Sequence, residues 1–350
     1  MEKPPNVPQR PGTRPSRAAA VAGFLRRTLA LGLLACVIAS LGLTAGSGAE
    51  PERPRSFSEQ ALNEAFATSR VLAAQADSLA ASLDPGSAAE LQSAANILNQ
   101  QALLLTSPGG TAAAQKSAAP QTQSYPRALL ESARKNLAAA GRADYGTARL
   151  LASTGTGQLL LADRAARALG EPLGQLQDSG WTPVLEDSDL PKCSSGDRAV
   201  LRDRPGAAES LQAAVNAEYG AAYGYEVAQA QAGSGFTVLG QPPTERRKAH
   251  LEAGREAVRL LPDLCLPEVT PLPAWSLDPG FLADPVSSLR ELEETMPHLY
   301  ADLAGSSDGA VRSWAIDRLV ATSLLLYSTS EIPPAPGLDA VPAHLPWAAG

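Results

Sequence analysis

The chain has 350 residues and a formal net charge of −7, with 19% charged and 5% aromatic residues. Charges are spread along the chain, and no basic face or run of aromatic residues is present, which argues against a nucleic-acid-binding protein. The dominance of Ala and Leu favours closely packed helices over a β-sandwich, which would need β-branched and aromatic strands. About 300 residues remain after a targeting segment, which is more than one small core usually holds, so two domains are expected.

The N-terminus has the three-part pattern of an export signal. Residues 1–27 are polar and basic, residues 29–43 are almost entirely apolar, and Ser47-Gly48-Ala49 has the small-x-small form of a cleavage site. The apolar run is short for a spanning helix, which needs about 20 residues. We expect residues 1–49 to be a signal peptide or an N-terminal membrane anchor. The rest of the protein is then extracytoplasmic, either secreted or anchored to the cell membrane.

Two short motifs in this segment leave the export route open. Arg26-Arg27, just before the apolar run, partly resembles a twin-arginine signal, which exports folded proteins. Leu33-Leu34-Ala35-Cys36 partly resembles a lipoprotein box, although the apolar run continues past Cys36, where a lipoprotein signal normally stops. The sequence therefore decides neither between the general and twin-arginine routes nor between a lipidated and an unmodified Cys36.

Two cysteines, Cys193 and Cys265, remain after residue 49. A pair of cysteines in an exported chain usually forms a disulfide, because the compartment is oxidising. We expect a Cys193–Cys265 bridge, which would close a long loop and stabilise the fold by about 2–4 kcal/mol. Two free thiols are the alternative.

Residues 50–170 are expected to form an N-terminal helical domain. Apolar residues recur there at helical spacing over four segments, which predicts helices at 57–83, 88–105, 126–140 and 143–169. A connection rich in Gly, Ser, Ala and Gln joins the second and third helices. The region contains no His and no Cys, so it offers neither imidazole nor thiolate to a metal.

A linker at 171–206, rich in Pro, Gly and acidic residues, precedes a second helical domain at 207–340 and a tail at 341–350. The same periodicity predicts four helices in this domain, at 209–232, 245–261, 286–303 and 309–328. A Pro-rich crossover joins the middle two, and Pro297 should kink the third helix. The expected fold class is all-α, with two tandem four-helix-bundle domains.

A carboxylate lies on the apolar face of the helix predicted at 209–232. Spacings of four and three alternate along one stripe, formed by Leu211, Val215, Glu218, Ala222 and Tyr225. An ionisable group on such a stripe is costly to bury unless it is paired, protonated or bound to a ligand. Each of the other three helices offers one candidate partner, namely His250, Glu293 and Asp317.

Several segments together resemble an uncharacterised ferritin-like domain of exported actinobacterial proteins. They are EYGAAYGY at 218–225, His250, LEE at 292–294 and LYADL at 299–303. The resemblance covers about residues 207–340, and it implies a four-helix bundle of the ferritin-like superfamily without an established activity. Members often have His directly after the first-helix Glu, where this chain has Tyr219, so one potential ligand is missing.

Ferritin-like di-metal centres take one Glu from each of two helices and a Glu-x-x-His motif from each of the other two. Such ligands suit iron or manganese, but residues 207–340 contain no Glu-x-x-His. Glu218, His250 and Glu293 are the candidate ligands. The alternatives are a buried polar network of these residues with Asp317, neutralised by His250 or Arg318, or exposure of most of them to solvent. The network is favoured, so no cofactor is expected, with iron or manganese as the alternative.

Motifs for catalysis are absent from the sequence: there is no Gly-rich phosphate loop, nucleophile elbow or zinc-ligand spacing. We expect an exported helical protein that acts as a non-catalytic binding or scaffolding protein of the cell envelope. A divergent ferritin-like metal-binding or redox protein is the alternative. The expected partner is an envelope protein or a small ligand, with no nucleic acid, and with membrane contact only through the N-terminal segment.

Overall fold

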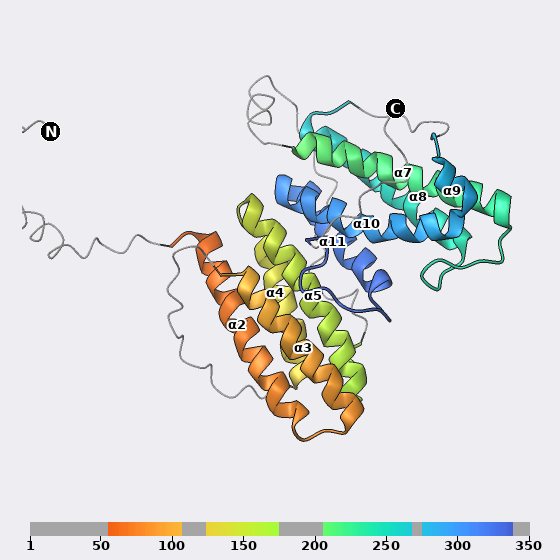
Figure 1. The fold of residues 1–350 in the computed structure, drawn as a ribbon. Coiled ribbons are helices and arrows are strands. Elements are labelled where there is room, and N and C mark those ends of the chain that lie inside the picture. The colour runs from red at the N-terminus through yellow and green to blue at the C-terminus, as the bar shows by residue number, and fades with distance from the viewer. Residues whose placement is uncertain (1–54, 107–123, 175–205, 268–274, 339–350) are drawn as a thin grey trace, which may run out of the picture. The chain divides into compact units, whose positions relative to one another are not determined.

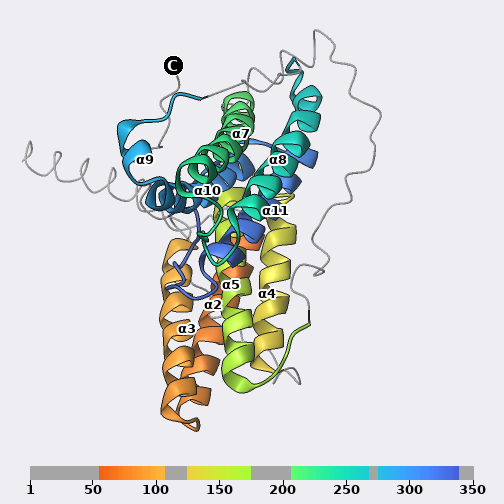
Figure 2. The same ribbon diagram turned by 90° about the vertical axis from the view of Figure 1, so that its right-hand side faces the viewer.

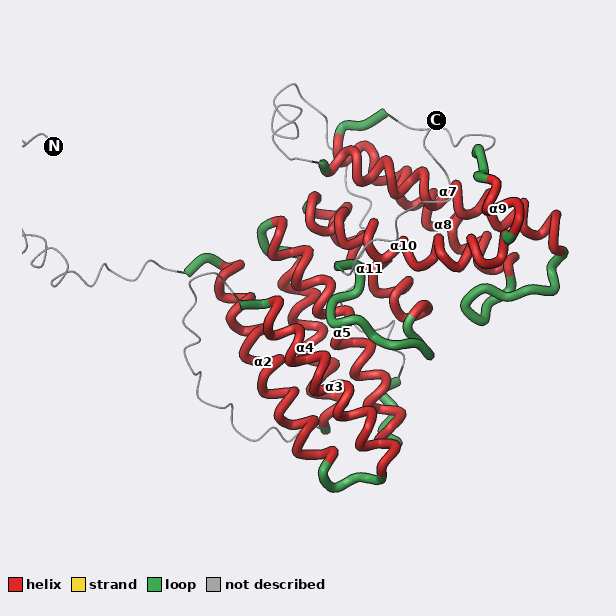
Figure 3. The backbone as a smooth tube through the Cα atoms, viewed as in Figure 1, coloured by secondary structure: helices red, strands yellow, loops and turns green. Residues whose placement is uncertain are grey.

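The computed structural model describes residues 55–106, 124–174, 206–267 and 275–338. Within these ranges the regular structure is helical, apart from an isolated bridge between Val238 and Gln241 (Figure 3). The all-α prediction is therefore confirmed for the described part of the chain. Among the described helices, none combines the length and the hydropathy of a transmembrane span. The export segment at 1–49, most of the linker at 171–206 and the tail at 341–350 lie outside the described residues.

The first group of helices comprises α2 (Phe57–Ala80), α3 (Pro85–Leu104), α4 (Tyr125–Ala140) and α5 (Tyr145–Leu169). They lie side by side, with α2 packed on α3 and α4 packed on α5 (Figures 1 and 2). Their shared core is built from Leu and Ala, which allows close approach of the helices. The four predicted segments are thus all helical.

Side-chain caps set where these helices begin. Ser56 starts α2 with a capping box. The Asp84 carboxylate starts α3 by accepting hydrogen bonds from the backbone N–H groups of Gly86 and Ser87. The predicted start of this helix at residue 88 was wrong, because Pro85 suits the first helical position, where no N–H is needed.

The second group comprises α7 (Ala207–Ala232), α8 (Pro243–Leu260), α10 (Pro285–Ser306) and α11 (Gly309–Leu326). Helix α7 packs on both α8 and α10, and α10 packs on α11. Two short elements that the sequence did not predict, η2 (Leu261–Leu264) and α9 (Pro279–Ala283), lie in the crossover between α8 and α10. Helix α10 continues through Pro297, which has no N–H to offer the carbonyl of Glu293 one turn earlier.

The two groups are in contact through α5, which packs against α10 and α11. Arg149 of α5 forms an ion pair with Asp302 of α10. The buried Arg312 of α11 donates to the carbonyl oxygens of Ala140 and Ala143, at 3.3 and 2.7 Å. A cation is favourable at the C-terminal end of α4, where carbonyls lack helical partners. The division into domains at 50–170 and 207–340 remains a prediction. The helices predicted for the two domains pack against each other through α5, α10 and α11.

The segment 332–338, which follows the last helix, packs between helices. The Gln101 side-chain amide of α3 donates to the Pro334 carbonyl at 2.7 Å, and a Cβ on Gly157 of α5 would lie 2.9 Å from that carbonyl oxygen. Gly337 has a φ of +82°, and a Cβ there would collide with the Pro297 carbonyl of α10. Two glycines therefore allow the segment to contact helices of both groups.

Candidate functional site

Three of the four side chains singled out above come together in the core of the second group. Glu218 on α7, His250 on α8 and Glu293 on α10 are each at most 1% exposed. The stripe predicted on α7 is buried along its whole length, at Leu211, Val215, Glu218, Ala222 and Tyr225. The helical phase read from the sequence thus turns Glu218 inward.

His250 joins the two carboxylates. Its Nδ1 lies 2.7 Å from Glu218 Oε2, and its Nε2 lies 3.1 Å from Glu293 Oε1. An ionised carboxylate can only accept, so a doubly protonated ring satisfies both contacts. A neutral ring could instead accept from Arg246 Nη2, which lies 3.3 Å from Nε2. The Glu293 carboxylate lies nearer to Nε2 than Arg246 does. Burial lowers the pKa of His250, but Glu293 and Glu218 raise it by more. We therefore assign the imidazolium.

Glu293 is held by three donors besides His250. Arg246 of α8 donates through Nε to Oε1 at 2.9 Å and through Nη2 to Oε2 at 2.7 Å. The Tyr225 hydroxyl of α7 donates to Oε1 at 2.7 Å. Burial raises the pKa of Glu293, but His250 and Arg246 lower it more, so the pKa falls well below its ordinary value. Glu293 is therefore ionised in the core.

Glu218 has matching surroundings. The Tyr300 hydroxyl of α10 donates to Oε1, and Arg318 Nε of α11 lies 3.8 Å from the same oxygen. Each buried carboxylate thus has one tyrosine, one arginine and a share of His250. The cluster draws residues from α7, α8, α10 and α11, so it links all four longer helices of the second group.

The tyrosine contacts are crossed between α7 and α10. Glu218 is followed by Tyr225 on α7, and Glu293 is followed by Tyr300 on α10, seven residues later in each case. Seven residues are about two helical turns, so the Glu and Tyr of one helix lie on the same face. Each tyrosine binds the glutamate of the other helix. The two crossed bonds therefore fix the register of α7 against α10.

Asp317 does not join this cluster, which corrects the four-residue network expected from the sequence. It is half-buried, and its Oδ1 is enclosed without a hydrogen-bond partner in the described residues. Burial raises the pKa of Asp317 to about 7, while Arg318 lowers it and Glu256 raises it. Consecutive residues point about 100° apart on a helix, so Arg318 rather than Asp317 faces Glu218.

The iron or manganese of a ferritin-like centre does not fit these residues. All four carboxylate oxygens already accept a bond from Tyr, His or Arg, and both nitrogens of His250 are engaged. The guanidinium groups of Arg246 and Arg318 supply positive charge to the two carboxylates. A metal ion would need to displace these donors, leaving buried cations unpaired.

A second buried polar cluster lies in the first group and is neutral. Gln158 Oε1 accepts from Ser132 Oγ at 2.7 Å and from Asn136 Nδ2 at 3.0 Å. Its Nε2 donates to Ser69 Oγ and Gln101 Oε1, both at 3.1 Å. One amide on α5 thus ties together α2, α3 and α4 without any ionisable group. The sequence did not single it out.

The predicted disulfide cannot be placed, because Cys193 lies outside the described residues. Cys265 follows η2 directly, with a positive φ of 56°. The Cys193–Cys265 bridge therefore stays a prediction.

We expect Glu293→Gln to lower the free energy of unfolding by about 3–5 kcal/mol, because it leaves the buried Arg246 without its counter-charge. The double variant Arg246→Met/Glu293→Gln should lose less than the sum of the two single variants, because neither charge is then stranded. Urea denaturation at neutral pH measures both effects.

The matched control for Glu293→Gln is Glu226→Gln, because Glu226 forms an exposed ion pair with Arg247 that also joins α7 to α8. Its effect should stay below about 0.5 kcal/mol. Equal losses for Glu293→Gln and Glu226→Gln would show that the buried pair does not hold the core together.

Residues 210–340 match the family model described as Domain of unknown function (DUF4439). The matched range includes every member of the charge cluster, from Glu218 to Arg318, and the segment 332–338. Among curated proteins and solved structures, no significant match was found. The match supports an uncharacterised domain over this part of the chain and carries no activity.

Proposed function

We propose that this is an exported, non-catalytic binding or scaffolding protein of the cell envelope, built around a ferritin-like bundle at 207–340. One observation carries the proposal: the charge cluster in the core of the second group is closed to solvent and internally paired. A catalytic centre needs a group free to react, and a metal centre needs ligand atoms that are not already bonded to protein donors. This cluster offers neither at Glu218, His250 or Glu293.

The location in this proposal rests on the N-terminal sequence. A basic segment, an apolar run and small residues before Glu50 form the pattern of an export signal. An acidic, helical protein with a rigid core suits a role in which one surface holds a partner in place. Scaffolding requires stability and surface complementarity rather than a reactive centre.

The location is tested with a reporter fused after Ser56. A reporter that is active only outside the cytoplasm should give signal, and a reporter that is active only inside should not. A fusion lacking residues 1–49 serves as the control and should reverse the pattern. Cytoplasmic activity of the full fusion would contradict export.

The alternative metal-binding role is tested by metal analysis of protein isolated from its native compartment. Iron and manganese should be far below one equivalent, and a chelator should leave the melting temperature unchanged. If metal held the bundle together, its removal would lower that temperature, because metal binding is coupled to folding. Stoichiometric iron or manganese with a chelator-sensitive melting temperature would establish the metal-binding alternative instead.

A further inference from the structure

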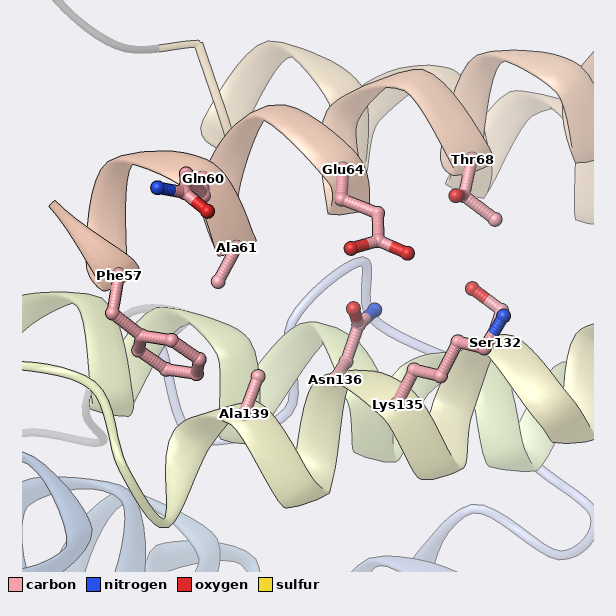
Figure 4. A pocket seen from close by; sticks show the side chains of 9 residues that line it. All are labelled: Phe57, Gln60, Ala61, Glu64, Thr68, Ser132, Lys135, Asn136 and Ala139. Atoms are coloured by element: carbon pink, nitrogen blue, oxygen red, sulfur yellow. The ribbon is translucent and has the colours of Figure 1, made fainter. Parts of the chain in front are cut away.

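A small pocket opens between α2 and α4, away from the charge cluster (Figure 4). Its volume is about 140 Å³, close to that of the roughly 150 Å³ cavity that holds a benzene ring in another protein. The pocket has an apolar end and a polar end. Phe57 and Ala61 of α2 form part of the apolar end, opposite Ala139 of α4.

The floor of the polar end is fixed from beneath by the neutral network. Ser132 and Asn136 line the pocket, are at most 5% exposed, and both donate to Gln158 Oε1. These bonds use the Ser132 hydroxyl proton and one amide proton of Asn136. The Asn136 carbonyl oxygen remains an acceptor, so the floor favours a ligand that brings donors.

The charge at the polar end is negative. Figure 4 shows Glu64 of α2 and Asn136 of α4 pointing toward one another across the pocket. Within the described residues Glu64 has no ion-pair partner, whereas the charge of Lys135 at the rim is paired with Glu131 at 3.1 Å. The uncompensated carboxylate therefore favours a cationic ligand.

We propose that this pocket binds a small organic ammonium ion. The ammonium group lies between the Glu64 carboxylate and the Asn136 carbonyl, and a single ring or short alkyl chain lies against Phe57 and Ala61. Acceptors at one end and apolar carbon at the other match such a molecule in both charge and size. The inference deepens the proposed binding role by naming one ligand class, and it rests on that role being binding rather than catalysis.

The test uses calorimetric titration of the purified protein with benzylammonium. Phenylacetate and benzyl alcohol, which have the same ring with an anionic or neutral head, are the controls for charge. Benzylammonium should bind measurably, benzyl alcohol more weakly, and phenylacetate not at all. Glu64→Gln should weaken benzylammonium binding about tenfold, and Ala61→Leu should abolish it by filling the apolar end.

Glu90→Gln is the matched control, because Glu90 is an exposed carboxylate on α3 outside the pocket. The Glu90→Gln variant should bind benzylammonium as tightly as the unsubstituted protein does. Glu64→Gln, Ala61→Leu and Glu90→Gln should all keep the melting temperature of the unsubstituted protein. No binding of benzylammonium, or equal binding in Glu64→Gln, would overturn the proposal. Either result would leave export and the metal content, which are measured without the amine, unaffected.

Discussion

Two carboxylates buried at the centre of a helical core impose the constraint on which the second helical group depends. Glu218 and Glu293 are fully enclosed, and an unpaired buried charge costs several kcal/mol. The neighbouring helices therefore have to supply donors at fixed positions. Helix α8 supplies His250 and Arg246, α11 supplies Arg318, and α7 and α10 exchange tyrosine hydroxyls.

The buried charge cluster specifies how the helices of the second group pack more than it raises the free energy of unfolding. Buried ion pairs often contribute little compared with well-packed apolar residues, but breaking one of them is strongly destabilising. A slip of α7 against α10 by one turn would separate both tyrosines from both glutamates at once. The cluster therefore acts against alternative packings of Ala-rich helices, whose small, similar side chains do little to select one register.

Each helical group has a buried polar cluster that links its helices, but the two clusters differ in chemistry. The first group centres on the neutral amide of Gln158, and the second on charged pairs around His250. Gln158 and the charge cluster are enclosed, so the ligand recognition that we propose falls to the surface. The pocket between α2 and α4 fits this division, because its floor is held rigid by Ser132 and Asn136 while its charged rim stays open.

Periodicity was enough to find the centre of the cluster but not its whole membership. It predicted that Glu218 faces inward, because the α7 stripe has one clear phase, and it named His250 and Glu293 as candidate partners. Arg246 was missed, although it lies one turn before His250, because a run of Arg246, Arg247 and Lys248 is typical of a solvated face. The assignment of Asp317 failed because adjacent positions on α11 both carry charge.

The crossed tyrosine contacts and the packing of residues 332–338 depend on contacts between distant segments, so they could not be predicted from the sequence. The shared spacing of Glu218 to Tyr225 and of Glu293 to Tyr300 is visible in the chain, but its crossed pairing requires knowing that α7 packs on α10. The packing of residues 332–338 likewise depends on Gly157 and Gln101, far earlier in the chain. Local patterns specify helices and faces, whereas tertiary contacts decide which faces meet.

An imidazolium at His250 bridges the two buried carboxylates on which the second helical group depends. Nitrogen-15 NMR of the three histidines, with His250→Gln to assign the signal, tests it directly. At neutral pH both ring nitrogens of His250 should be protonated, because Glu293 and Glu218 outweigh burial and raise the pKa of His250 above its ordinary value. A neutral ring at neutral pH, with Nε2 unprotonated and accepting from Arg246, would contradict the claim.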